Sequence, residues 1–329
     1  MAVLLLTASE VHDLLDMRGC IDVMADALSD LERGRFEQPL RIAFAPKNAA
    51  GGVLTWMPAH RSGPNAVYGM KIACLVPSNP ARGLDFHQGA VVLLDGETGQ
   101  LRAVMNSSAV TAIRTAAVSG VATRSLARED ARELAIIGAG IQARTHLEAM
   151  LCVRPIQRVQ IVSRTTQSAK RFVEWASTRF GVTIRVADSV ESAVQSADIV
   201  VTVTTAHEPV LFGRWLAPGT HVNAVGASNP KHCEIDKTVV AAASLFTDRR
   251  ESLFSEAADF RAALEQGLVS SDHLRGELGQ VLTGAIPGRQ SPGEITLFRS
   301  LGLASEDVAA GYYLLQKARS QGAGTIAEY

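Results

Sequence analysis

Residues 134–143 read LAIIGAGIQA, an apolar run that ends in two closely spaced glycines. The pattern GxGxx[GA], which marks a strand turning sharply into a helix, matches Gly138, Ala139, Gly140, Ile141, Gln142 and Ala143. Gly138 permits the tight turn, Gly140 lets the backbone approach phosphates, and the first N–H groups of the helix can hold a pyrophosphate. Glycines also cluster in ordinary helix-packing turns, but the apolar run before the motif and the helical pattern after it favour a dinucleotide site.

The residues around this motif alternate between strand and helix patterns. Apolar runs typical of buried parallel strands are ELAIIG (133–138), RVQIVSR (158–164), TIRVA (183–187), DIVVTVTT (198–205), HVNAVG (221–226) and SLFTD (244–248). Helical patterns such as QARTHLEAMLC (142–152) and TTQSAKRFVEWASTRF (165–180) separate them. This alternation over about 120 residues predicts an α/β fold with a doubly wound parallel sheet, the Rossmann architecture.

The regions before and after this alternating stretch have different sequence patterns. Residues 9–35 place apolar groups at helical spacing between an expected N-cap at Ser9 and a stop at Gly34, so two short helices are expected to open the fold. Between about 40 and 105, runs such as YGMKIACLV (68–76) alternate with turn clusters, which predicts a mostly antiparallel sheet. A helix is expected from Ala109, and another, over 305–320, is expected to close the chain.

The composition excludes several classes of protein. The 329 residues are 47% hydrophobic and 20% charged, as in folded globular proteins. The 32 Lys and Arg balance 33 Asp and Glu without blocks of like charge, which argues against nucleic-acid binding. No apolar run approaches the length of a membrane span, and MAVLLL (1–6) is too short for a signal peptide core. We therefore expect a cytoplasmic enzyme that binds small molecules.

No metal site is expected. The four cysteines are far apart and include no CxxC pair, which argues against a disulfide framework and a structural zinc site. The stretch HVNAVGASNPKHCEID (221–236) does bring a His, a Cys and a Glu together. These three are consecutive, however, and adjacent side chains do not easily converge on one ion.

The loop after the second predicted strand bears on the cofactor. In NAD enzymes an acidic residue here binds the ribose 2′-hydroxyl, but residues 162–166 read VSRTT and contain no carboxylate. Arg164, with the hydroxyls of Ser163, Thr165 and Thr166, suits a 2′-phosphate. The sequence therefore predicts NADP(H) as the preferred cofactor, with NAD(H) possible; the alternative is that Arg164 is a solvated loop residue.

Three cations lie among apolar neighbours: Arg41 in PLRIAF (39–44), Lys71 in YGMKIAC (68–74) and Arg114 in TAIRTAA (111–117). An unpaired cation is costly to bury, and together these three could hold a substrate carboxylate. Taken singly, such residues are more often paired surface cations or side chains whose charged end reaches water.

Several motifs, taken in order, resemble those of the ornithine cyclodeaminase/mu-crystallin family. They are PSNPARGL (77–84), DGETGQLRAVMNSSAVTAIRTAAVSGVATRSLAR (95–128), IIGAGIQARTH (136–146), VNAVGASNPKHCEID (222–236), GELGQVLTG (276–284) and ITLFRSLGLASEDV (295–308). The resemblance covers nearly the whole chain. It implies a homodimer with a Rossmann NAD(P)-binding domain at 116–302 and an α+β substrate-binding and dimerisation domain built from 1–115 and 303–329.

The resemblance also implies roles for single residues. Arg41, Lys71 and Arg114 match the family's substrate-binding positions, so they would hold the carboxylate of an amino or imino acid, and Lys71 could supply a proton. His87, in DFHQGA (85–90), matches a pocket position of the mu-crystallin branch, with a core or loop histidine as the alternative. The family's positions near the cofactor or the reacting atoms correspond in this chain to Thr204, Val225, Gly226, Ser228 and residues 298–301.

One departure from the family pattern selects among its reactions. The cyclodeaminases use an Asp shortly after the glycine that corresponds to Gly226, whereas residues 226–230 here read GASNP, and neither Ser nor Asn acts as a base near neutral pH. The mu-crystallin-like ketimine reductases share this departure. We therefore predict NADPH-dependent reduction of a cyclic ketimine carboxylate, Δ1-pyrroline-2-carboxylate or Δ1-piperideine-2-carboxylate, to L-proline or L-pipecolate. The alternatives are an ornithine cyclodeaminase, an alanine-dehydrogenase-like enzyme and a non-catalytic ligand-binding protein.

Overall fold

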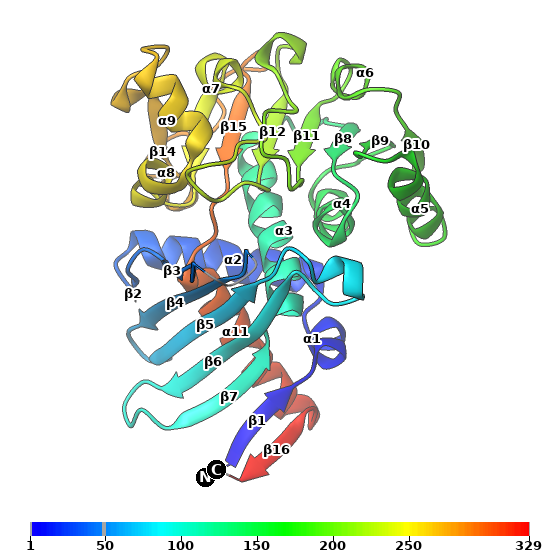
Figure 1. Cartoon of the computed structure of the whole chain (residues 1–329). Coiled ribbons are helices and arrows are strands. Elements are labelled where there is room, and N and C mark those ends of the chain that lie inside the picture. The colour runs from blue at the N-terminus through cyan, green and yellow to red at the C-terminus, as the bar shows by residue number, and fades with distance from the viewer. Residues whose placement is uncertain (1, 48–50, 329) are drawn as a thin grey trace. The chain divides into compact units, whose positions relative to one another are not determined.

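The computed structural model describes residues 2–47 and 51–328. The chain divides into two compact units, Met1–Thr115 with Leu303–Tyr329 and Ala116–Gly302 (Figure 1). Helix α3 (Ser107–Leu126) begins in the first unit and ends in the second. Each unit is built on its own eight-stranded sheet. Within the described residues, no helix combines the length and apolar character needed to cross a membrane.

The sheet of the first unit has the strand order β16-β1-β7-β6-β5-β4-β2, and β3 pairs with β4. Its strands are β1 (Ala2–Leu6), β2 (Phe36–Glu37), β3 (Ile42–Phe44), β4 (Val53–Arg61), β5 (Val67–Leu75), β6 (His87–Asp95), β7 (Leu101–Asn106) and β16 (Thr325–Glu328). Neighbours are antiparallel except β1 and β7, which run parallel. The predicted antiparallel region is confirmed.

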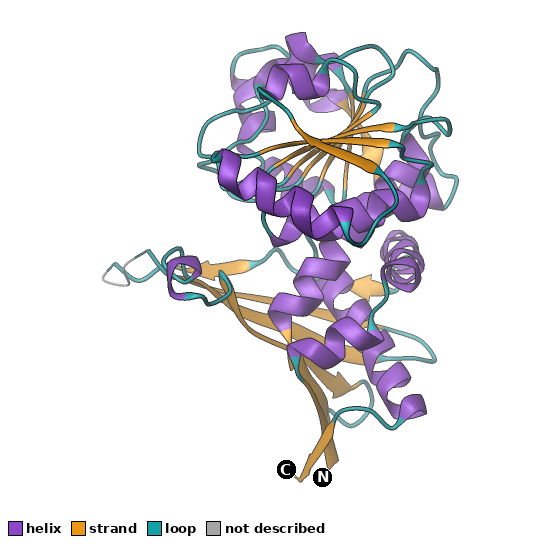
Figure 2. Ribbon diagram, turned by 90° about the vertical axis from the view of Figure 1, so that its right-hand side faces the viewer, coloured by secondary structure: helices purple, strands orange, loops and turns teal. Residues whose placement is uncertain are grey.

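Helices cover one face of this sheet, as Figure 2 shows. They are α1 (Ala8–Leu14), α2 (Met17–Glu32) and α11 (Ala304–Gln321). The alternation along β5 reflects this, because Gly69 and Lys71 are buried while Tyr68 and Ile72 are exposed. Helix α11 packs directly on the β5 backbone: a Cβ atom on Gly69 would lie 2.6 Å from a methyl carbon of Val308.

The sheet of the second unit is parallel, in the order β10-β9-β8-β11-β12-β15-β13-β14. Its strands are β8 (Glu133–Ile137), β9 (Arg158–Val162), β10 (Thr183–Val186), β11 (Ile199–Thr202), β12 (His221–Ala224), β13 (Ser244–Thr247), β14 (Leu274–Glu277) and β15 (Thr296–Arg299). The chain runs outward from β8 to β10 and then returns to β11 on the other side of β8. Strand order therefore reverses between β8 and β11, where such sheets bind ligands beyond the carboxyl ends of the strands.

Helices lie on both faces of this parallel sheet (Figure 2). They are α4 (Ile141–Val153), α5 (Thr166–Ser177), α6 (Val190–Val194), α7 (Lys237–Ala242), α8 (Arg250–Glu256), α9 (Ala258–Glu265) and α10 (Leu278–Leu282). The predicted doubly wound α/β architecture is confirmed.

Expectations about the ends of elements were partly wrong. The chain opens with β1 rather than a helix, because the apolar N-terminal run pairs with β7 and β16. Helix α1 starts at Ala8, and its N-cap is Thr7 rather than Ser9, since the Thr7 hydroxyl accepts the N–H of Glu10. Helix α3 starts at Ser107, two residues before the expected Ala109. The last helix does not close the chain, because β16 follows it and pairs with β1.

Candidate active site

Two of the three predicted clamp residues lie together on the helix-covered face of the first unit's sheet. Lys71 is on β5 and Arg114 on α3, and each side chain is 5% exposed. Lys71 Nζ lies 2.8 Å from Asp307 Oδ2, and Arg114 Nε donates to Asp307 Oδ1 at 2.9 Å. Arg114 Nη1 donates to Glu306 Oε2 at 2.5 Å. Both carboxylates lie in the first turn of α11, where the helix dipole favours negative charge.

Burial and neighbouring charges set the protonation of this cluster. Burial, followed by the positive charge of Arg114, lowers the pKa of Lys71 to about 8, while Asp307 opposes the shift. Burial alone would raise the pKa of Asp307, but the charges of Arg114 and Lys71 outweigh it and lower that pKa. Near neutral pH Lys71 is therefore mostly an ammonium, and it releases its proton within an accessible pH range.

Arg41 and His87 belong to the same electrostatic cluster. The charge of Arg41, which directly precedes β3, contributes to the lowered pKa of Lys71. His87 is the first residue of β6, and burial followed by the charges of Lys71 and Arg114 lowers its pKa to about 4. His87 is thus a neutral imidazole near pH 7. Ser228, which was also predicted on the substrate side, lies in the second unit, in the loop after β12.

The predicted dinucleotide loop lies at the carboxyl end of β8. Gly138 has a φ of +114° and a Cβ atom there would lie 2.4 Å from the carbonyl oxygen of Val203, so only glycine fits. Gly140 is the N-cap of α4, and a Cβ atom on it would meet no described atom within 4 Å. No side chain of the described residues hydrogen-bonds as a cap here. The open approach and the first N–H groups of α4 therefore suit a phosphate.

Side chains of the same loop also fit a dinucleotide. Gln142 Oε1 is buried without a hydrogen-bond partner among the described residues, so it can accept from a ligand. Ile141 is 52% exposed at the start of α4, whereas Ala143 is buried. The glycine turn, the open approach and the lone acceptor together fit the predicted cofactor.

The loop after β9 is only partly free for a 2′-phosphate. Arg164 is exposed. The hydroxyl of Thr165 accepts the N–H of Ser168 at 3.3 Å as the N-cap of α5 and also donates to Ser168 Oγ at 2.8 Å. Thr165 is thus occupied as a helix cap, which leaves Ser163 and Arg164 as the stronger candidates for phosphate recognition.

The loops after β11 and β12 are joined by one carboxylate. Glu234 is 2% exposed and accepts the Thr202 hydroxyl at 2.9 Å and the backbone N–H groups of Thr204 and Gly226. A Cβ atom on Gly226 would lie 2.3 Å from the carbonyl oxygen of Thr204. Val225 N–H donates to the Thr202 carbonyl at 3.1 Å, which extends the pairing past the strand ends. The predicted cofactor-side residues Thr204, Val225 and Gly226 therefore form one tightly packed corner.

The side chains after β12 point in different directions. The His232 ring stacks on the His207 ring, with centroids 3.9 Å apart and planes 5° apart, whereas Glu234 is buried in the bonds described above. Over residues 2–47 and 51–328, no group of three or more His, Cys, Asp or Glu side chains could hold a metal ion.

Sequence patterns missed the carboxylates that pair with the two buried cations. Asp307 and Glu306 lie in SEDV (305–308), which reads only as the start of a helix. The signal that could have found them is the rule that buried cations need partners, since Lys71 and Arg114 were placed among apolar residues. Glu234 was likewise weighed only as a metal ligand, together with His232 and Cys233.

Residues 1–322 match the model of the ornithine cyclodeaminase/mu-crystallin family. The chain belongs to this family. The expected resemblance is thereby confirmed, and two relatives named as reductases support its reductase branch. A Bacillus cereus protein named Δ1-pyrroline-2-carboxylate reductase is 36% identical over 327 residues, which cover 99% of this chain and 100% of the relative. The ketimine reductase mu-crystallin of Mus musculus is 37% identical over 309 residues, 93% of this chain and 94% of the relative.

Two solved structures also resemble the chain over its length. The Δ1-pyrroline-2-carboxylate reductase of Thermococcus litoralis, in complex with NADH and L-proline, superposes with a TM-score of 0.95 at 35% identity, over 98% of this chain and 99% of that one. An archaeal alanine dehydrogenase dimer with bound NAD gives 0.93 at 31% identity, over the full length of both chains.

Proposed function

We propose that this chain is an NADPH-dependent reductase of a cyclic ketimine carboxylate, such as Δ1-pyrroline-2-carboxylate or Δ1-piperideine-2-carboxylate. The observation that carries the proposal is the buried pair Lys71 and Arg114, held by Asp307 within electrostatic range of Arg41. Such a cluster offers an anion site and a proton donor at once. Full-length likeness to reductases of cyclic ketimines supports the same reaction.

The three cations of the predicted clamp have separate roles in the proposed reaction. Arg41 and Arg114 bind the carboxylate and fix the ring, so that C2 is presented in one orientation. The nicotinamide cofactor, when bound, supplies the hydride that adds to C2. Lys71 donates its proton to the imine nitrogen, directly or through water, because the iminium accepts hydride more readily. The L-amino acid then leaves with one hydride and one proton gained.

The titration of Lys71 predicts the pH dependence. Its pKa is lowered to about 8, so the ammonium is present below that pH and is lost above it. We expect kcat/KM for the ketimine to fall about tenfold per pH unit above about pH 8. Steady-state rates between about pH 6 and 10 measure this limb. In Lys71→Arg, whose guanidinium neither titrates in this range nor releases its proton, the rate should be lower and the limb should vanish. A limb that persists there belongs to the substrate and contradicts the assignment.

We expect Arg164 to select the phosphorylated cofactor. Arg164→Ala should raise the Kd for NADPH by about tenfold or more, because a charge-assisted bond is lost, and should leave the Kd for NADH unchanged. Quenching or enhancement of nicotinamide fluorescence on titration measures both. Arg171→Ala, an exposed arginine of α5, is the matched control. Equal changes in the Kd values for NADPH and NADH would show that Arg164 does not recognise the 2′-phosphate.

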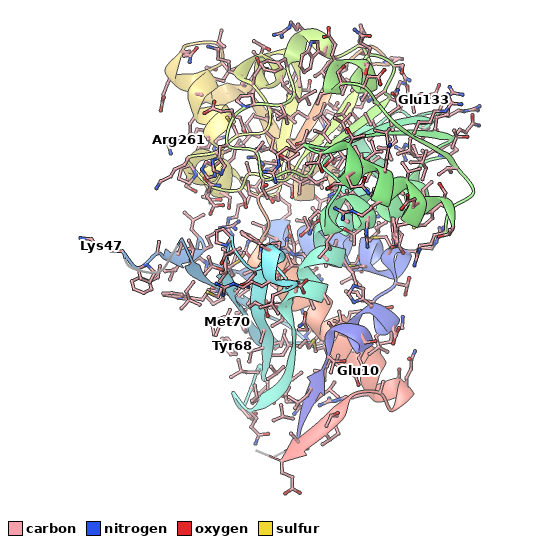
Figure 3. All side chains as sticks on the ribbon, turned by 45° about the vertical axis from the view of Figure 1, so that its right-hand side comes forward. Glu10, Lys47, Tyr68, Met70, Glu133 and Arg261 are labelled. Carbon is pink, nitrogen blue, oxygen red and sulfur yellow. The ribbon has the colours of Figure 1, made fainter. Side chains whose placement is uncertain are left out.

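We infer that the chain forms a homodimer through the uncovered face of the first unit's sheet. That face carries Leu5 (37% exposed), Leu54 (37%), Tyr68 (49%) and Ile72 (38%). Figure 3 shows Tyr68 and Met70 on the side away from the helices. An apolar sheet face of this kind is rarely left open on a monomer. The archaeal alanine dehydrogenase of the same fold is a dimer.

A charge on this face tests the dimer. Ile72→Glu should convert the protein from a dimer to a monomer in light scattering, because the glutamate would be desolvated in the interface. Leu268→Glu, at an exposed leucine of the second unit (47%), should leave the mass unchanged. Dimers that survive Ile72→Glu at all concentrations would place the interface elsewhere.

A substrate panel separates the proposed reaction from its rivals. NADPH and NADH oxidation would be followed with cyclic ketimine carboxylates and with 2-oxo acids plus ammonia. We expect the cyclic ketimines to be preferred. Preference for a 2-oxo acid with ammonia would indicate an alanine-dehydrogenase-like enzyme. Ammonia release from L-ornithine without net cofactor turnover would indicate a cyclodeaminase, and binding without turnover a ligand-binding protein.

A further inference from the structure

The loop that follows β12 is held by two buried charged side chains. Glu234 accepts the N–H of Gly226. Arg299 Nη1 donates to the carbonyl of Ala224, the last residue of β12, at 3.1 Å, and its Nη2 donates to the Ala227 carbonyl. Glu234 and Arg299 are 2% and 1% exposed. We call these two residues the brace.

The brace is itself anchored. Arg299 Nε lies 3.1 Å from each carboxylate oxygen of Asp259, which is 2% exposed. Glu234 also binds the Thr202 hydroxyl and the Thr204 N–H at the end of β11. The loop after β12 is therefore tied to three neighbours, β11, β15 and α9.

Burying a carboxylate and a guanidinium is costly, and apolar residues of similar size often stabilise a core as well or better. Stability alone thus gives little reason for the brace. Its hydrogen bonds end on the backbone of loops at the carboxyl ends of β11 and β12. That edge is where a doubly wound sheet binds its ligand.

The position of the brace selects one half of a dinucleotide. The glycine loop after β8 and the Arg164 loop after β9 lie on one side of the strand reversal, and they suit the pyrophosphate and the adenosine ribose. The ends of β11 and β12 lie on the other side, which leaves them the nicotinamide half. A substitution in the brace should therefore weaken binding of the nicotinamide half and leave binding of the adenylate half unchanged.

We infer that Glu234 and Arg299 are positioning residues that hold residues 225–227 in the conformation that receives the nicotinamide ring. The inference rests on the proposed binding of a nicotinamide dinucleotide, and it adds the residues that set the ring's position. Neither residue need touch the substrate.

Glu234→Gln tests the inference. The amide keeps the size of the side chain but puts an NH2 group against the backbone N–H of either Thr204 or Gly226, so residue 234 loses at least one of its bonds to the two loops. We expect the Kd for NADPH to rise about tenfold or more, while the Kd for 2′-phospho-ADP-ribose, which lacks the nicotinamide, stays within about twofold. Glu251→Gln, at a side chain 57% exposed, is the control and should change neither.

Thr202→Val removes one bond to Glu234 and changes no loop residue, since Thr202 ends β11. It should weaken NADPH binding by less than Glu234→Gln does, again without weakening the fragment, and it replaces Glu234→Gln if that variant does not fold. Equal losses for NADPH and the fragment, or no loss for either, would overturn the inference. These binding measurements need no turnover. Suppose that the wild-type protein shows no ketimine reduction while Glu234→Gln still weakens binding of NADPH and not of 2′-phospho-ADP-ribose. That result would refute the proposed reaction and leave the inferred role of the brace standing.

Discussion

Lys71→Met should lower kcat/KM for a cyclic ketimine carboxylate by about 10²–10⁴, the range typical of losing a general acid. The methionine keeps the length of the side chain but cannot donate a proton or attract a carboxylate. The Kd for NADPH should stay within about twofold, because Lys71 binds Asp307 and Thr111, and neither belongs to the glycine loop or the Arg164 loop. Stopped-flow or steady-state NADPH oxidation gives the rate, and fluorescence titration gives the affinity.

Lys317→Met is the matched control for this loss. Lys317 lies on α11 in the same unit, and its side chain is 24% exposed beside Asp16. It should keep kcat/KM within about twofold, as expected for an exposed ion pair. If Lys71→Met also retained most of its activity, the buried cluster would not be the substrate site.

Arg114→Ala should lower the free energy of unfolding by about 3–5 kcal/mol, since removing one partner of a buried ion pair leaves uncompensated charge. The carboxylates of Asp307 and Glu306 have fully buried side chains and both bind Arg114. Urea unfolding at one fixed protein concentration measures the loss.

The comparison for Arg114 is a more exposed arginine of the same unit, Arg102 on β7. Arg102 Nη1 lies 3.4 Å from Asp95 Oδ2, with 35% of its side chain exposed. Arg102→Ala should cost about 0–1 kcal/mol, as surface ion pairs usually do. Similar losses in the two variants would mean that the buried network contributes no more than a surface pair.

The second unit could be predicted because its signals are local. Each buried strand is a short apolar run, and the glycine loop joins a strand to the helix that follows it. The edge of the first sheet could not be predicted in this way. Strands β1 and β16 pair residues from the two ends of the chain, such as Val3 with Ala327, and no local pattern announces such a partner.

The same distinction applies to the site. The burial of two cations of the predicted clamp could be anticipated, because Lys71 and Arg114 stand among apolar neighbours in the sequence. Their counter-ions lie 192 and 193 residues beyond Arg114, so only the fold brings Glu306 and Asp307 to it. The absence of an Asp after Gly226 is evident from the sequence alone. The bond from the Gly226 N–H to Glu234 could not be predicted, because it forms only in the folded loop.

The most direct test of the proposed reaction follows the hydride. The protein would be incubated with Δ1-pyrroline-2-carboxylate and NADPH carrying deuterium at both C4 positions, and the product would be resolved by chiral chromatography and mass spectrometry. We predict L-proline with one deuterium, located at C2, formed in step with NADPH oxidation. No deuterated amino acid from this or the six-membered ketimine, with either cofactor, would contradict the proposed function.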